Sequence, residues 1–136
     1  MTSEGFIPAD SCEYAIEYLP AAAMTPKIGM ALAFNASGQL AASADPKYIC
    51  LRAGAAVTAG TVIPVLRIDS KMKFEACLDA ATAFKAGTVA QITADGLKVD
   101  ADGSTSGVFQ IVELDGTAAG STVRGYFVVK EVEKSA

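Results

Sequence analysis

Short apolar segments separated by turn residues run along most of this 136-residue chain. From residue 27 onward, turns such as Asn-Ala-Ser-Gly, Asp-Gly and Ala-Gly recur at intervals of roughly 8 to 15 residues. Segments of this length, bounded by such turns, are typical of β-strands. The pattern predicts an all-β fold, a small sandwich or barrel, formed by a single domain over residues 27–136.

Two stretches of this region follow the same pattern. Residues 27–38 and 85–96 both begin with Lys-x-Gly, continue as an apolar run and end in a turn that closes on glycine. The similarity predicts an internal duplication, with pseudo-repeats over 27–84 and 85–132. The two leading glycines are expected to share a backbone with positive φ: Gly29 and Gly87.

The first 26 residues show a different pattern. Over residues 13–19 the side chains alternate, which places the tyrosines and the isoleucine on one face and both glutamates on the other. We therefore expect residues 1–26 to form an extended N-terminal arm. Two alternatives remain: a short helix capped by Asp10, with Glu13 at the capping-box position, or an edge strand of the domain itself.

The β-rich region has one segment with helical spacing. Between Ala76 and Ala86, the apolar side chains Leu78, Ala81 and Phe84 recur every three residues. The sequence therefore predicts at most one short helix, joining the two pseudo-repeats.

Charge and composition narrow the function. Apolar residues make up 51% of the chain, charged residues 19%, and the net charge is −4. A nucleic-acid-binding domain would be basic, so we expect no nucleic-acid partner. No apolar run approaches the roughly 20 residues that span a bilayer, so we expect no membrane partner either. So few charges favour a surface that is partly covered by a partner or by other copies.

The sequence offers little catalytic chemistry. Histidine is absent, which excludes Ser-His-Asp and Cys-His arrangements. Asp95, Asp100 and Asp102 lie in Gly-rich turns, where aspartate is expected for its own backbone hydrogen bonds. The segment from Asp100 resembles the start of a calcium loop, but Ile111 stands where that loop needs a bidentate acid. We expect a non-enzymatic protein without a cofactor or metal.

The three cysteines are Cys12, Cys50 and Cys77. They have no Cys-x-x-Cys spacing, and an odd number cannot form a complete disulfide framework. We interpret them as small buried apolar residues. A Cys50–Cys77 bridge is left open, because both residues lie in or beside expected strands.

One short stretch has a functional resemblance. Residues 57–76 resemble the biotinyl and lipoyl carrier domains, in which a hairpin tip presents a lysine for acylation. Here that lysine would be Lys71. Ser70 before it and Pro64 in the first strand depart from the carrier pattern. The alternative is an ordinary solvated turn.

A second resemblance spans most of the chain. It rests on the Tyr-Leu-Pro-Ala-Ala segment, the Lys-x-Gly units, two apolar segments and the closing Gly-rich strand, residues 18–22, 27–32, 46–49, 65–68, 85–87 and 120–127. This order is similar to that of tailed-phage capsid decoration and head-fibre proteins. The resemblance implies an all-β structural protein on the outer surface of the virion, which binds the major capsid protein and cements it. It also implies a homo-oligomer, with a trimer favoured.

The expected contact site is the arm, because exposed aromatic and aliphatic side chains are frequent anchors at interfaces. The residues expected to contact the capsid are Phe6, Ile7, Tyr14, Ile16, Tyr18 and Leu19. The residues at 1–5 lack a basic region followed by an apolar run, so we expect synthesis in the host cytoplasm without a signal peptide. A structural subunit of another repetitive assembly is the main alternative. A carbohydrate-binding module is disfavoured by the absence of Trp.

Overall fold

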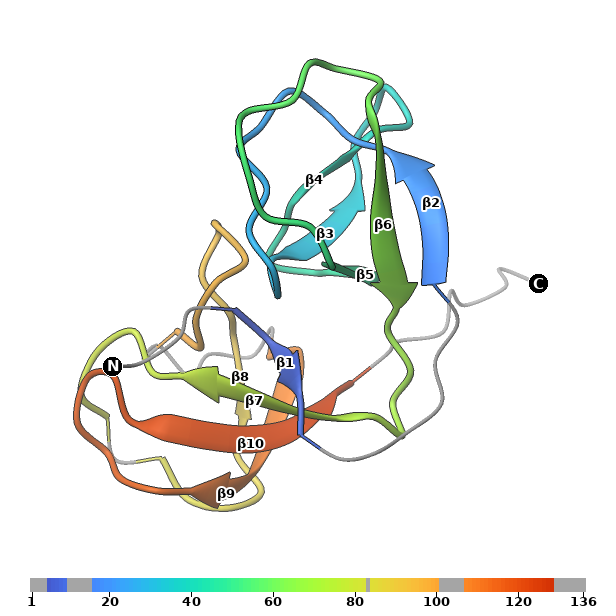
Figure 1. Cartoon of the computed structure of the whole chain (residues 1–136). Helices are drawn as coiled ribbons and strands as arrows, with labels where there is room; N and C mark the ends of the chain where they lie inside the picture. Colours follow the sequence, from blue (N-terminus) through green and yellow to red (C-terminus); the bar gives the residue numbers. More distant parts are fainter. Residues whose placement is uncertain (1–4, 10–15, 83, 101–106, 129–136) are drawn as a thin grey trace.

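The computed structural model describes residues 5–9, 16–82, 84–100 and 107–128 and contains ten strands in two antiparallel five-stranded sheets (Figure 1). Sheet A consists, in spatial order, of β1 (Ile7–Pro8), β7 (Lys73–Cys77), β10 (Thr122–Phe127), β9 (Phe109–Leu114) and β8 (Val89–Ala90). Sheet B consists of β2 (Ile16–Pro20), β6 (Val62–Arg67), β5 (Tyr48–Cys50), β3 (Ala31–Phe34) and β4 (Leu40–Ala42). The prediction of an all-β fold is confirmed.

The two sheets follow the same path along the chain. Strands β2 to β6 form a first unit with the order β2-β6-β5-β3-β4, and β7 to β10 form a second unit with the order β7-β10-β9-β8, which matches the first unit apart from β4. In each unit a single parallel bridge links the residue after the first strand to a later part of the unit. The bridge joins Ala21 to Leu40 in the first unit and Leu78 to Val99 in the second. Each unit is therefore a small, strongly curved sheet.

The boundary between the units differs from the sequence prediction. The predicted first repeat, 27–84, includes β7, whereas β7 pairs with β10 and opens the second unit. Each unit begins one strand before its Lys-x-Gly turn. The internal duplication itself stays a prediction, supported by the shared strand order and by two glycines with similar φ, +88° at Gly29 and +95° at Gly87.

The predicted helix at 76–86 is wrong. Ala76 and Cys77 end strand β7, where they pair with Val123 and Thr122, and the structure has no helix in the residues it describes. Alternate side chains of this strand, Phe74 and Ala76, are buried in the core. Burial on one face of a sheet thus outweighs a weak helical spacing. Nor does the described part of the chain hold a helix long and apolar enough to cross a membrane.

A phenylalanine cluster fills the main core. The ring of Phe127 lies 5.1 Å from the ring of Phe6, 5.1 Å from that of Phe109 and 5.3 Å from that of Phe74, measured between centroids. These tilted and edge-on arrangements are the favourable ones for aromatic pairs. Sheet B contributes apolar side chains to the same core, from Ala31, Ile49 and Leu66. The two units therefore share one core.

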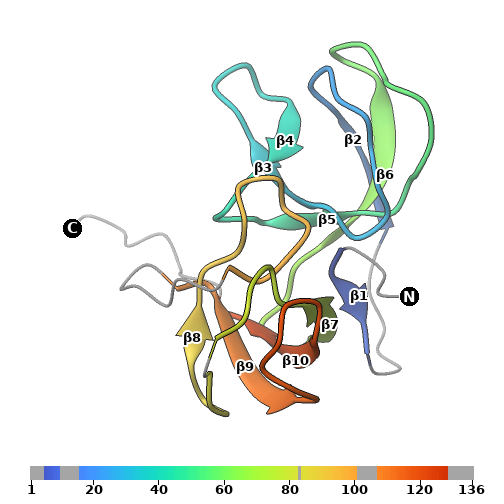
Figure 2. The same ribbon diagram turned by 90° about the vertical axis from the view of Figure 1, so that its left-hand side faces the viewer.

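The other face of sheet B has a smaller core of its own. It is built from Leu32, Leu40, Ile63 and Val65, all fully buried. The turn between residues 92 and 99 of the second unit reaches across to this sheet (Figure 2), and Leu97 from that turn is buried in the smaller core. The second unit thus contacts the first on both sides.

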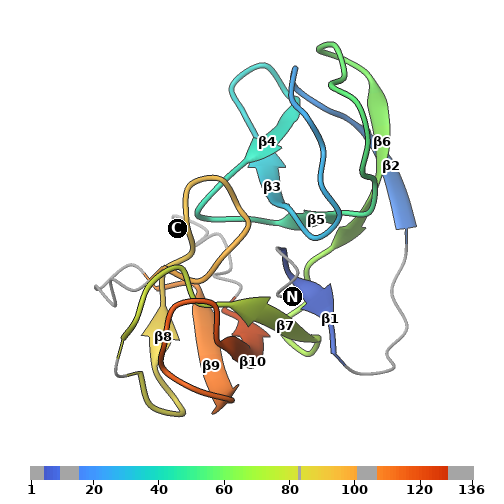
Figure 3. The same cartoon turned by 60° about the vertical axis from the view of Figure 1, so that its left-hand side comes forward.

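The described parts of the N-terminal segment, residues 5–9 and 16–26, pair with both sheets, as the edge-strand alternative expects. β1 pairs with β7 of the second unit, and β2 pairs with β6 of the first (Figure 3). The rival short helix at Asp10 and Glu13 lies outside the described residues. Deletion of this segment would remove an edge strand from each sheet, so the body is not expected to fold without it.

The backbone at the junction of the units is closely packed. The Gly5 amide donates to the Leu97 carbonyl at 2.9 Å, and the Phe6 amide donates to the Gly29 carbonyl at 2.8 Å. The Ala31 amide donates to the Gly96 carbonyl at 2.8 Å. We call this set of three hydrogen bonds the junction. It ties the N-terminal segment and both units to one another.

Gly29 and Gly87 give a matched test of the junction. A Cβ on Gly29 would lie 2.7 Å from the Phe6 nitrogen, whereas a Cβ on Gly87 would meet nothing within 4 Å. Both substitutions strain a backbone with positive φ, at about 1–2 kcal/mol. We expect Gly87→Ala to lose about that much stability in urea unfolding, and Gly29→Ala to lose at least about 3 kcal/mol. Equal losses would show that the close packing contributes nothing.

Candidate functional site

Exposed apolar side chains gather at the free edge of sheet B. Ile16, Tyr18 and Val62 are 52%, 68% and 54% exposed. In the β2–β6 register, Tyr18 stands opposite Pro64, Ile16 opposite Leu66 and Pro20 opposite Val62. Opposite residues share a face of the sheet, so these side chains lie on one surface. We call Ile16, Tyr18, Val62 and Pro64 the β2 surface.

The β2 surface continues a face that is buried elsewhere. Leu66 lies on the same face of β6 as Val62 and is fully buried in the shared core. β6 and β2 extend away from sheet A in Figure 1, so this face leaves the cover of the second unit toward Val62. Side chains of the type that fill the core are thus uncovered at the edge strand, a common mark of an interaction site.

The charged residues beside the β2 surface are neutralised on the opposite face. Arg67 donates to both carboxylate oxygens of Glu17, at 2.9 and 3.1 Å, and its guanidinium lies 5.6 Å from the ring centroid of Tyr48. The hydrogen bond to Glu17 raises the pKa of Arg67. Because Glu17 points away from Ile16 and Tyr18, the four residues of the β2 surface present no charge.

The outer face of sheet A has the opposite character. Arg124 lies 3.0 Å from Glu75, 3.0 Å from Asp115 and 3.6 Å from Glu113, and Lys73 lies 3.0 Å from Glu113. The hydrogen bond to Asp115 is the main cause of the raised pKa of Arg124. A network of ion pairs of this kind is well suited to water. The β2 surface is therefore the better candidate for a docking site.

The structure places the expected contact residues differently. Ile16 and Tyr18 are exposed on one face, in agreement with the alternation in the sequence. Phe6 is corrected, because it is fully buried against Phe109 and Phe127 and has no surface to offer.

The remaining contact residues carry less weight. Ile7 and Leu19 are half-buried: Ile7 pairs with Glu75, and Leu19 packs on the smaller core. Tyr14 lies outside the described residues. Val62 was missed by the sequence analysis. Its signal was the alternation of Val62, Pro64 and Leu66 along the next strand of the sheet.

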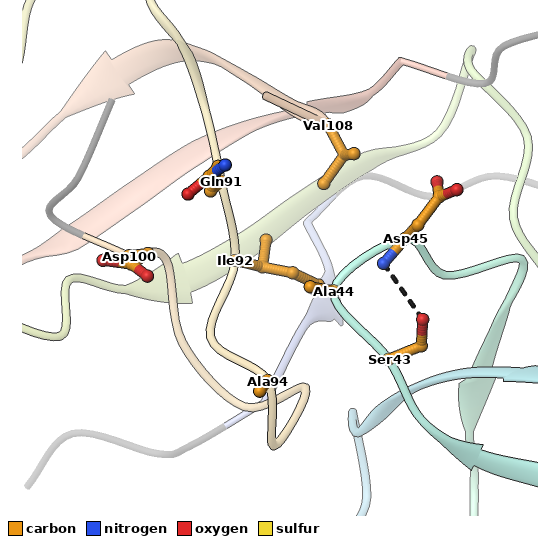
Figure 4. Close-up of a pocket in the computed structure, with 8 residues that line it drawn as sticks. All are labelled: Ser43, Ala44, Asp45, Gln91, Ile92, Ala94, Asp100 and Val108. Atoms are coloured by element: carbon orange, nitrogen blue, oxygen red, sulfur yellow. Dashed lines mark hydrogen bonds between the residues drawn. The ribbon is translucent and has the colours of Figure 1, made fainter. Parts of the chain in front are cut away.

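A cleft of about 660 Å³ lies between the two units. Its lining combines two aspartates with an amide, a hydroxyl and apolar side chains: Ser43, Ala44, Asp45, Gln91, Ile92, Ala94, Asp100 and Val108. Figure 4 shows Asp45 and Asp100 at opposite sides, with Ile92 between them. The Asp45 amide donates to the Ser43 hydroxyl at 3.0 Å, and the Asp45 carboxylate lies 3.7 Å from the Lys47 ammonium. Within the described residues, no three His, Cys, Asp or Glu side chains lie close enough together to hold a metal ion.

The predicted carrier lysine does not lie at a hairpin tip. Lys71 is exposed, and its amide donates to the Asp69 carboxylate at 2.9 Å. However, β6 before it pairs within sheet B and β7 after it pairs within sheet A. The two flanking strands therefore belong to different sheets, and the hairpin that carrier domains use is not formed here.

The disulfide that the sequence left open is absent. Cys50 and Cys77 are both buried thiols, so the Cys50–Cys77 bridge is not formed. The Cys50 thiol donates to the Arg52 carbonyl at 3.2 Å, and burial raises the pKa of this thiol. A protonated, buried thiol is a poor nucleophile, which agrees with a structural role. Cys12 lies outside the described residues.

No protein-family model matches the chain, and no curated protein matches it.

Phe6 and Tyr18 provide a test of how the N-terminal residues divide between core and surface. We expect Phe6→Ala to lose about 3–5 kcal/mol of stability, because it empties the centre of an aromatic cluster. Tyr18→Ala should change stability by less than about 0.5 kcal/mol, because its side chain is exposed. The measurement is urea unfolding of the two variants beside the wild type. A Phe6→Ala variant as stable as the wild type would show that the Phe6 side chain does not lie in the core.

Proposed function

We propose that this protein is a non-enzymatic structural protein that binds the outer surface of a bacteriophage capsid and stabilises it. The proposal rests on the resemblance of the chain to capsid decoration and head-fibre proteins. The single observation that supports it best is the uncharged β2 surface, with Ile16, Tyr18 and Val62 uncovered at the edge of sheet B. Its partner is then the major capsid protein.

A shell under internal pressure separates where its subunits meet, and a protein that bridges these junctions adds interface area. The gain is multiplied because many copies act on one particle. A homo-oligomer, with a trimer favoured by the resemblance, would present several β2 surfaces at once. Each could then bind weakly while the assembly binds tightly.

The β2 surface replaces the longer arm as the proposed contact. Phe6 is excluded because its side chain is in the core. Tyr18 is the central anchor, since a large aromatic side chain on a rigid strand offers much contact area at little cost in conformational entropy. Because this surface carries no charge, binding should survive moderate salt.

Co-sedimentation with undecorated phage heads tests the proposal. We expect Tyr18→Ala to weaken binding by about 30-fold, since a buried aromatic anchor contributes roughly 2 kcal/mol or more at an interface. Ile16→Ala should weaken it further when combined with Tyr18→Ala. The matched control is Val89→Ala, which removes an apolar side chain that is 36% exposed on β8, at the far edge of sheet A.

The possible results separate the proposals. If the Tyr18→Ala variant binds heads as tightly as the wild type, the contact lies on another surface. The same holds if Tyr18→Ala and Val89→Ala weaken binding equally. If the wild-type protein does not bind heads but assembles with itself, the proposal gives way to a structural subunit of another repetitive assembly.

A further inference from the structure

The outer edge of β7 shows how this fold covers the first strand of a unit. β1 lies antiparallel along that edge, with Ile7 opposite Glu75 and Pro8 opposite Phe74. The Ala9 amide also donates to the Lys73 carbonyl at 2.8 Å. A short extended segment of apolar residues thus covers the edge of β7 from Lys73 to Glu75.

β2 holds the same place in sheet B as β7 holds in sheet A. Each is the first strand of its unit and pairs antiparallel with the last strand, β6 or β10. Tyr18 lies three residues before the bridged residue Ala21, and Glu75 lies three residues before the bridged residue Leu78. Tyr18 in β2 therefore corresponds to Glu75 in β7. β2 nevertheless ends its sheet, and among the described strands none lies beyond it. Within residues 5–9, 16–82, 84–100 and 107–128, no strand fills in sheet B the place that β1 fills in sheet A.

Pro64 identifies which backbone groups of β2 face this edge. Its carbonyl accepts from the Leu51 amide at 3.0 Å, on the side of β6 that faces β5. Backbone groups alternate between the two sides of a strand, so the neighbours of Pro64 bond toward β2. Tyr18 stands opposite Pro64 in the register. Its amide and carbonyl consequently point outward, as those of Ile16 also do.

The edge of β2 lacks most features that keep edge strands from pairing. Natural edges are commonly blocked by lysines, inward-pointing charges, bulges or proline. In β2 the one charged residue, Glu17, is bound to Arg67, and the one proline, Pro20, stands at the end of the strand. The outward groups lie beside the uncharged β2 surface. A charged partner side chain buried against this surface would find no opposite charge, which is costly, so the surface favours a segment without charge.

We propose that the outer edge of β2 accepts an extended, uncharged strand of the shell protein, which pairs antiparallel with Ile16 and Tyr18 as β1 pairs with β7. This inference rests on the proposed function and specifies its mode: main-chain hydrogen bonds hold the partner, and apolar side chains of the strand cover Tyr18 and Val62. Strand addition of this kind derives affinity from the backbone and specificity from alternate side chains.

Hydrogen exchange at the Tyr18 amide tests the proposal directly. Amide hydrogens are exchanged in the free protein and in the protein bound to undecorated heads. The bound protein is then released, and the remaining amide signals are measured by NMR. In the free protein the Tyr18 amide should exchange fast, whereas the Leu19 amide, which faces β6, should be protected. On binding, exchange at Tyr18 should slow by at least about tenfold with little change at Leu19. Binding without protection at Tyr18 would overturn strand addition and leave capsid binding intact.

Substitution at the same position separates backbone from side chain. Tyr18→Pro removes the outward amide, whereas Tyr18→Val removes the aromatic ring but keeps the amide. The hydrogen bonds between β2 and β6 involve neither the amide nor the ring of Tyr18, so both variants should unfold at similar urea concentrations. We expect Tyr18→Pro to bind heads at least about tenfold more weakly than Tyr18→Val. Equal binding by two folded variants would contradict the proposal, and a Tyr18→Pro variant that fails to fold leaves the exchange measurement to decide.

The same exchange measurement detects other occupants. If the wild-type protein does not bind heads, the proposed function fails, and this is seen before any exchange is measured. Protection at Tyr18 that grows with the concentration of the protein alone would assign the edge to β2 of a second copy and overturn a shell strand. A Tyr18 amide that is protected in dilute, free protein would show that the edge is not open.

Discussion

The packing of Phe6 into the core between the two units is the contact on which the rest of the structure depends. Its ring lies 5.1 Å from that of Phe127 and 5.4 Å from that of Phe109, while its amide bonds to Gly29 of the other unit. Neither curved sheet could bury its apolar face alone, because a five-stranded sheet of short strands encloses little volume. Phe6 therefore packs against the rings of one unit while its backbone bonds to the other.

Local signals in the sequence predicted the strands and turns but not their assembly. Turn glycines such as Gly29 and the short apolar segments between them identify an all-β chain, because strand and turn preferences are local. The position of Phe6 could not be predicted, since nothing near it distinguishes a core residue from an interface anchor. The false helix at 76–86 has the same cause: Ala76 lies in a strand because of its distant partner Val123.

Only the part of the candidate site that lies within one strand could be predicted from the sequence. Alternation within one strand correctly placed Ile16 and Tyr18 on a shared face, because the side-chain period of a strand is independent of its partners. Val62 joins them only through the pairing of β2 with β6, a contact between residues far apart in the sequence. The opening beside Tyr18 is harder still to predict, since it depends on where β1 goes.

A cryo-EM reconstruction of the decorated phage head would show which face of the protein meets the shell. We expect sheet B to face the shell and an extended segment of the capsid protein to lie along β2 at strand spacing, roughly 4.8 Å away. Phe6 should stay in the core. A map in which the shell contacts the charged outer face of sheet A around Arg124, with Tyr18 in solvent, would contradict this arrangement.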